Sequence, residues 1–243
     1  MRKLLAVLSL LYIAGCSSQT ISNPHQQPQI IYNINVTNYE DDLFHVSVLV
    51  NNLTEKNNVY NFAATAPGTY QKMDFGRYVK SFEAFDDEGN LLNTNKISKN
   101  RWEIENINAL VKIKYVIEDT FDSEIKKNPP AAMSGSGIDE KFISINTFAV
   151  LGYFEELQSH PSKLKLDYNQ DWTVGTALNK NDDGYYYTET YDRLADSPIL
   201  MGELTTAFTK VGDIDVEIYV YSPDTTINAT KVLSLADEVL QSS

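Results

Sequence analysis

The stretch FHVSVLVNNL, residues 44–53, decides the fold class of this chain. Apolar side chains stand at every second position from Phe44 to Val50, and His45 and Ser47 lie between them. A period of two is typical of a strand that has one face in a hydrophobic core. IIYNINV, residues 30–36, has the same period just before it, so we predict a pair of antiparallel, half-buried strands.

Similar short stretches follow one another along the chain, with turns rich in Gly, Asn and Asp between them. We expect strands at 30–36, 44–53, 59–64, 79–85, 91–92, 99–104, 109–118, 143–151, 163–166, 172–178, 185–191, 204–211 and 214–221. We also expect a long surface loop over 120–141, a helical turn at 153–157 and a helix at 232–240. The predicted fold is all-β: an antiparallel β-sandwich of about a dozen short strands with a C-terminal helix.

The N-terminus has the layout of an export signal that ends at a cysteine. Two basic residues precede an apolar run over 4–13, and small residues at 14 and 15 precede Cys16. This order resembles the bacterial lipobox, in which the cysteine is lipidated and becomes the new N-terminus. We therefore predict a lipoprotein signal peptide over 1–15, lipidation at Cys16 and a flexible, polar tether over 16–29. An uncleaved anchor helix is the alternative, although the apolar run is shorter than the roughly 20 residues that span a bilayer.

The residue after the cysteine is Ser17 rather than Asp, which by resemblance to bacterial lipoproteins favours the outer membrane. The expected location is the bacterial cell envelope, with the membrane as a partner through the lipid anchor. A further acyl chain such as palmitate on the same cysteine would make the attachment stable. Cys16 is the only cysteine, so the folded part is expected to contain no disulfide.

The charge balance argues against one class of partner. The chain has 33 acidic and 20 basic residues and a formal net charge of −13. Phosphates require a basic face, so we expect no nucleic acid partner. No linker-like change of composition divides the chain after the tether, so we predict one β-sandwich over 30–222 followed by a helical segment over 223–243.

Two stretches combine proline with polar residues in a way that suits an exposed rim. Residues 191–202 read YDRLADSPILMG, and residues 66–70 read APGTY. Proline restricts itself and the residue before it, and Pro-Gly favours a turn. The candidate interface residues are Pro67, Gly68, Tyr70, Tyr191, Asp196, Ser197 and Pro198. For Asp196 we favour a structural role in a turn over a place in a former cleft.

The sequence contains no recognisable motif for catalysis or metal binding. The three histidines, at 25, 45 and 160, cannot share one helical turn, and no Gly-x-Ser-x-Gly sequence occurs. The loops 167–172 and 179–184 partly resemble calcium-binding loops, but their Asn, Asp and Gly residues are also those that turns require. We therefore expect turns there, and we assign no catalytic residue, metal ligand or cofactor to this chain.

A further group of short motifs keeps a fixed order over 30–221. They are APGTY at 66–70, GRYV at 76–79 with Phe82 and Ala84, DEG at 87–89 with Leu92, Trp102, Val111 with Ile113, Tyr115 and Val116, LGY at 151–153, Trp172 with TAL at 176–178, and LADSPI at 194–199 with Gly202. Their order and rough spacing resemble the N-terminal domain of the glycyl aminopeptidase family of zinc metallopeptidases, metallopeptidase family sixty-one.

The resemblance implies a larger enzyme. Members of that family join this sandwich to a thermolysin-like zinc domain, and usually to a PDZ domain. The zinc domain has a His-Glu-x-x-His helix and removes N-terminal glycine or alanine. No such helix occurs here, so zinc would be a cofactor only if a catalytic domain followed 223–243. Whether the chain is part of an enzyme is left open, and it would be a truncated product or a domain that works alone.

Two function hypotheses follow. The first is a non-catalytic N-terminal β-sandwich domain from a lipid-anchored zinc metalloaminopeptidase lineage, with a catalytic domain as its partner. The alternative is a free-standing cell-envelope lipoprotein whose tyrosines at 185–187 and 191 hold a peptide or a protein partner. A pull-down from envelope extract that recovers nothing, together with a buried Tyr186, would remove the basis of this alternative.

Overall fold

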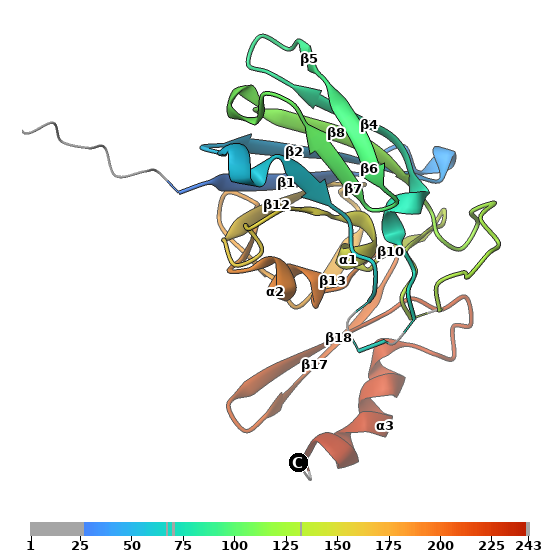
Figure 1. The fold of residues 1–243 in the computed structure, drawn as a ribbon. Helices are drawn as coiled ribbons and strands as arrows, with labels where there is room; N and C mark the ends of the chain where they lie inside the picture. Colours follow the sequence, from blue (N-terminus) through green and yellow to red (C-terminus); the bar gives the residue numbers. More distant parts are fainter. Residues whose placement is uncertain (1–26, 67, 70, 132, 242–243) are drawn as a thin grey trace, which may run out of the picture.

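The computed structural model describes residues 27–66, 68–69, 71–131 and 133–241. Its largest element is an eight-stranded sheet in the order β14-β15-β12-β1-β2-β8-β4-β5 (Figure 1). These strands are β1 (Gln29–Asn35), β2 (Leu43–Asn51), β4 (Val79–Phe85), β5 (Leu91–Leu92), β8 (Lys112–Glu118), β12 (Ser162–Asp167), β14 (Asn179–Lys180) and β15 (Tyr186–Thr188). Side chains alternate across this sheet, so one face is buried and the other faces solvent.

Two four-stranded sheets complete the sandwich. One has the order β13-β16-β10-β9, and the other has the order β11-β3-β7-β6. Their strands are β3 (Val59–Asn61), β6 (Thr94–Ser98), β7 (Arg101–Ile104), β9 (Gly137–Ile138), β10 (Phe142–Ile145), β11 (Tyr153–Phe154), β13 (Thr173–Thr176) and β16 (Ile199–Gly202). Because one hydrophobic cluster contains side chains from all three sheets, the mainly antiparallel β-sandwich predicted from the sequence is confirmed.

Aromatic side chains fill the space between the large sheet and the β11-β3-β7-β6 sheet. The Tyr60 ring lies 5.0 Å from Phe154 and 6.0 Å from Tyr115, measured between centroids. Phe62 meets Trp102 edge to face at 5.2 Å. Ring pairs in tilted and edge-to-face geometry stabilise a core by more than the burial of their apolar area alone. The geometry of these pairs therefore favours one arrangement of the two sheets.

One strand pair departs from the antiparallel pattern. β1 pairs with β2 antiparallel on one side and with β12 parallel on the other. A parallel pair requires a long crossover, and here the chain passes through both small sheets between Asn35 and Ser162. Both strands therefore begin at the same end of the sandwich, next to the described start of the chain.

Three of the predicted elements differ in the structure, and β6, β9, β14 and β16 lie in stretches where no strand was predicted. The apolar run 143–151 is divided between β10 and the short helix α1 (Thr147–Val150), and 153–157 contains the short strand β11 instead of a helical turn. The run 185–191 contains β15 and the first residue of α2 (Tyr191–Ala195). All four residues of α1 are buried, so that stretch has no wet face whose period would indicate a helix rather than a strand.

The last elements extend beyond the sandwich. β17 (Thr205–Val211) and β18 (Ile214–Val220) form a hairpin, and α3 (Ala229–Gln241) packs mainly against β17. In Figure 1 this unit, drawn in orange and red, lies below the three sheets. The predicted C-terminal helix is confirmed, and it begins three residues before the expected start.

Candidate functional site

Three tyrosine hydroxyls converge on one short segment between the sheets. Tyr32 donates to the carbonyl of Gly152 at 2.8 Å, Tyr115 to that of Val150 at 2.9 Å and Tyr191 to that of Leu151 at 2.8 Å. Burial raises the pKa of all three hydroxyls, so they stay protonated and act as donors. These bonds satisfy consecutive buried carbonyls where the chain leaves α1, so Tyr191 is part of the core.

Gly152 is required by the close packing at this segment. A Cβ added there would lie 2.4 Å from the carbonyl oxygen of Asn61 and 2.5 Å from the Tyr60 ring. A larger residue would separate the β11 segment from β3. The motif Leu151-Gly152-Tyr153 is therefore explained by packing between the sheets.

The stretch 191–198 is a capped helical turn. Thr190 is the N-cap of α2, and its hydroxyl accepts from the backbone N–H of Arg193 at 3.0 Å. The buried Ser197 hydroxyl donates to the carbonyl of Arg193 at 2.7 Å and completes the C-terminal end. Asp196 and Pro198 are exposed at the same turn. These candidate residues thus divide into buried structural groups and two exposed positions.

The other sequence candidates have different surroundings. Gly68 has a φ of +71°, which is the left-handed conformation expected in a Pro-Gly turn. Cys16, Pro67 and Tyr70 lie outside the described residues. Tyr186 is buried, and Tyr187 is the only one of its two tyrosine neighbours that is exposed, by 50%. Residues 185–187 therefore do not form an exposed tyrosine cluster.

The sequence did not reveal the role of Asp119. Its carboxylate accepts from the backbone N–H groups of Phe121 and Ile138, both at 2.6 Å, and of Asp122 at 3.3 Å. Burial raises the pKa of this carboxyl, although the three N–H groups oppose that shift. Asp119 thereby closes the long loop 120–141, within which the structure also contains β9.

Two aromatic contacts attach the C-terminal hairpin to the β13-β16-β10-β9 sheet. The Tyr221 ring stacks on Phe142 with 4.2 Å between centroids. Tyr219 covers Gly175 of β13, where an added Cβ would lie 2.4 Å from its ring. The hydroxyl of Thr205 accepts from the backbone N–H of Ala229 at 2.9 Å and holds α3 against β17. The hairpin and helix are therefore positioned by the sheet that contains residues 199–202.

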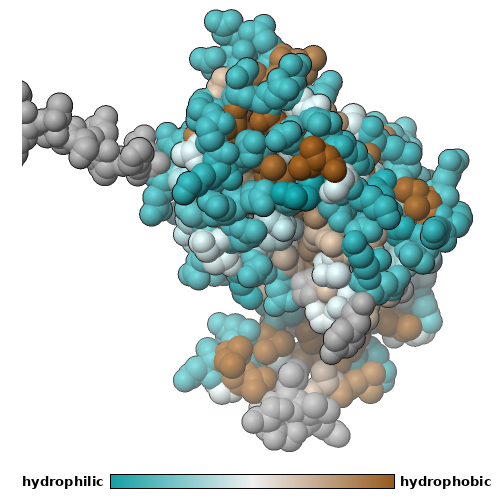
Figure 2. Space-filling view, viewed as in Figure 1, coloured by the Kyte–Doolittle hydropathy of each residue, from teal (hydrophilic) through white to brown (hydrophobic). Residues whose placement is uncertain are grey.

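Large apolar side chains are exposed on this hairpin and helix. They are Phe208 (63% exposed), Ile214 (68%), Ile227 (49%) and Leu235 (69%). Figure 2 shows brown surface in the lower part of the molecule, where Figure 1 places the hairpin and α3. We call these four residues together the hairpin–helix face; it includes both sides of the hairpin, because the register places Phe208 and Ile214 on opposite sides. Apolar groups exposed together on such an extension suit contact with a partner.

The loops that partly resemble calcium sites form turns. Asn181 accepts from the backbone N–H of Tyr185 through its side chain at 2.8 Å and from Gly184 through its carbonyl. Asn169 makes the equivalent bonds to Asp171 and Trp172. Within the described ranges, no three His, Cys, Asp or Glu residues are grouped as metal ligands. In the same part of the chain, no helix combines the length and hydropathy needed to cross a membrane.

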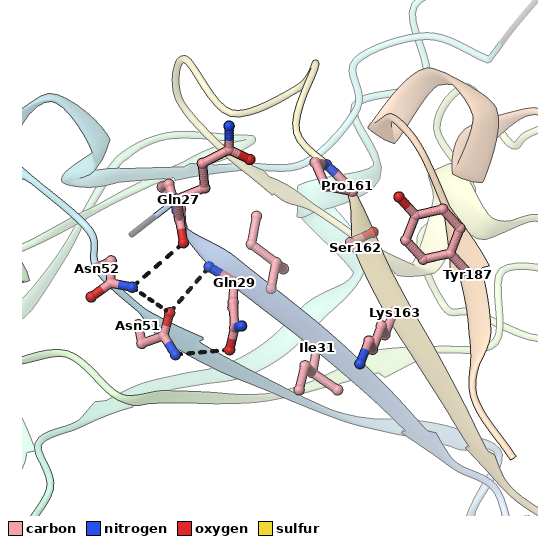
Figure 3. Close-up of a pocket in the computed structure, with 11 residues that line it drawn as sticks. Gln27, Gln29, Ile31, Asn51, Asn52, Pro161, Ser162, Lys163 and Tyr187 are labelled. Atoms are coloured by element: carbon pink, nitrogen blue, oxygen red, sulfur yellow. Dashed lines mark hydrogen bonds between the residues drawn. The ribbon is translucent and has the colours of Figure 1, made fainter. Parts of the chain in front are cut away.

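A cavity of about 370 Å³ lies where β1 and β12 begin. Figure 3 shows a linked group of amides on one side and Lys163 with Tyr187 on the other. Asn51 donates to the side chain of Gln29 at 3.0 Å and accepts from Asn52 at 3.1 Å, and Asn52 also donates to the carbonyl of Gln27. The amides thus hold the start of β1 to the end of β2.

Comparison with known proteins identifies the sandwich. Residues 31–203 match the family described as the Peptidase M61 N-terminal domain. The fold also matches a crystal structure of an aminopeptidase N family protein from Idiomarina loihiensis, with a TM-score of 0.74 and 20% identity. No curated protein that was compared matches the chain.

The structural match covers 88% of this chain and 36% of the other, so our chain spans little more than a third of that protein's length. Residues 1–203 make up about 84% of the chain, which is less than the 88% that the structural match covers. The match must therefore extend past residue 203. The similarity of fold therefore includes part of the hairpin and helix, which lie after the region matched by the family.

Proposed function

The chain belongs to the peptidase M61 family through its N-terminal domain, and on that premise we propose that it is a non-catalytic module of a lipid-anchored metalloaminopeptidase system. In this proposal Cys16 carries the lipid, the sandwich is the rigid body and the hairpin–helix face contacts a zinc-peptidase catalytic domain. The expected place is the bacterial envelope, at the outer membrane.

The observation that carries the proposal is the position of the hairpin–helix face. This face lies on elements after residue 203, where the family match ends, and the fold of a much longer aminopeptidase N family protein extends into the same elements. A two-stranded hairpin is marginally stable by itself and gains stability when another element covers it. A catalytic domain that encloses the hairpin would cover Phe208 on one side and Ile214 on the other, and both are exposed in this chain.

The burial of Tyr186 supports this proposal over the alternative of a free-standing peptide-binding lipoprotein. Its side chain lies in the core cluster, which weakens the tyrosine cluster on which the alternative depended. A pull-down from envelope extract that recovers no partner is the second test of that alternative. We therefore favour the peptidase module.

Hydrolysis and fractionation test the two parts of the proposal. The purified chain with Zn²⁺ and a glycine anilide should release no anilide, whereas metal-dependent turnover by the chain alone would overturn the non-catalytic assignment. The full chain should remain with membranes after a carbonate wash, and Cys16→Ser should abolish acylation as measured by mass. An acylated C16S protein would contradict the assigned lipid site.

A further inference from the structure

A row of exposed and partly exposed side chains crosses the outer face of the large sheet. The strand register places Tyr187 opposite Lys163, Lys163 opposite Ile31, Ile31 opposite Leu49, Leu49 opposite Lys112, and Lys112 opposite Phe85. Residues directly opposite one another on neighbouring strands point to the same face. These six residues, which we call the cross-sheet row, therefore form one continuous line over six strands.

The cross-sheet row contains both apolar and cationic side chains. Tyr187 is 50% exposed and Leu49 is 49% exposed, and Ile31 lies between them in the register. The ammonium of Lys112 lies over the Phe85 ring, 5.8 Å from its centre, so a positive charge stands next to apolar surface. The row thus combines groups that can enter an apolar layer with charges that bind anions.

The next row along the strands adds to the positive charge. Lys165 and Lys114 lie there with Asn33, Ser47 and Glu83. The two rows contain four lysines and one carboxylate, and one of the lysines, Lys165, forms an ion pair with Asp167 at 3.4 Å, whereas the whole chain has a net charge of −13. Exposed charges beyond about 10 Å are largely screened at 0.1 M salt, so a surface in contact with this face senses its lysines first.

The start of the described chain lies beside the row. Gln27 and Pro28 line the same cavity as Ile31, Lys163 and Tyr187 (Figure 3). Cys16 precedes Gln27 by eleven residues, and if these form the tether expected from the sequence they would span about 20 Å on average and at most about 40 Å. A lipid on Cys16 would therefore keep the row close to the bilayer at a high effective concentration, so that a weak contact suffices.

We propose that the cross-sheet row docks on the surface of an anionic phospholipid bilayer. Leu49, Ile31 and Tyr187 would enter the headgroup layer, and Lys112 and Lys163 would contact lipid phosphates. The inference rests on the proposed lipid anchor for its proximity. It also fixes an orientation, because the hairpin–helix face lies on elements outside the docked sheet and stays accessible.

An environment-sensitive fluorophore tests this docking. Leu49→Cys in the full, acylated chain supplies one reactive thiol, and the chain is reconstituted in vesicles of phosphatidylcholine with or without phosphatidylglycerol. With the anionic lipid, emission from position 49 should shift to shorter wavelength and be quenched by brominated acyl chains. Ile97→Cys is the matched control, since Ile97 is 43% exposed on β6 of another sheet and should show neither effect.

Charge reversal separates docking from anchoring. Lys112→Glu with Lys163→Glu should abolish the shift at position 49 while the acylated protein stays on the vesicles. Lys141→Glu with Lys231→Glu changes the net charge equally and should leave the shift in place. Equal emission from positions 49 and 97, or a shift that survives the Lys112 and Lys163 reversals, would overturn the proposal. Release of the protein from the vesicles would instead contradict the proposed lipid anchor on Cys16.

Discussion

The ring of Tyr221 stacks on the ring of Phe142, with 4.2 Å between their centroids and 22° between their planes. This contact joins the first residue after β18 to the first residue of β10, and it determines where the hairpin leaves the sandwich. The position of the hairpin–helix face therefore depends on a few aromatic contacts at the β13-β16-β10-β9 sheet.

Gly175→Val should loosen the hairpin. The new side chain would begin 2.4 Å from the Tyr219 ring, so Tyr219 must move away from β13. Overpacking of this kind costs about 1–3 kcal/mol. Hydrogen exchange should rise in 205–220 and stay unchanged in β1 and β2. Tyr219→Phe keeps the ring and loses only an exposed hydroxyl, so it should behave as wild type. Equal protection in G175V would show that Tyr219 does not hold the hairpin.

Tyr191→Phe should lower the free energy of unfolding by about 1–3 kcal/mol, because the buried carbonyl of Leu151 loses its donor. Urea denaturation measures the loss. Tyr187→Phe, at a half-exposed position, is the matched control and should change the stability by less than about 0.5 kcal/mol. The account of the tyrosine hydroxyls fails if both variants unfold at the same urea concentration as wild type.

Asp119→Ala should release the loop 120–141. The variant leaves the backbone N–H groups of Phe121 and Ile138 without their acceptor. We expect protease cleavage within 121–137 at concentrations that leave wild type intact. Asp122→Ala, which removes an exposed neighbouring carboxylate, should not produce this cleavage. Identical digestion of all three proteins would contradict the role given to Asp119.

Asp74 should make stability depend on pH. Burial would raise the pKa of this carboxyl, but the Asn100 amide, Lys72 and Lys99 outweigh burial and lower it below its ordinary value of 3.8. A lowered pKa in the folded state gives stability that is present above pH 3.8 and is lost as the pH falls through the folded value. The stability difference between wild type and Asp74→Asn should therefore shrink between pH 6 and pH 3. A difference that is constant over this range would contradict it.

The sequence predicted those strands of the sandwich that have one face in solvent. Alternation over 44–50 located β2, and alternation over 109–118 located β8, because each has solvent on one side. It could not locate α1 within 143–151, since all four residues of α1 are buried and the stretch has no wet face to show a helical period.

The role of Tyr191 depended on contacts that are distant in sequence. Its hydroxyl binds a carbonyl 40 residues earlier, and no local pattern indicates that partner. The exposed row on the large sheet also arises from register, which joins residues as far apart as Ile31 and Lys163 through a parallel pair. Such sites become visible only once the strands are paired.

In the proposed function, the hairpin–helix face receives a zinc-peptidase catalytic domain. Isothermal titration of this chain with the separately produced catalytic domain of an M61 aminopeptidase from the same envelope measures this contact. We predict saturable binding that Phe208→Ser with Ile214→Ser abolishes, while Leu91→Ser, at a similarly exposed position on the sandwich, leaves it intact. Absence of binding by wild type, or equal binding by the F208S/I214S variant, would contradict the claim.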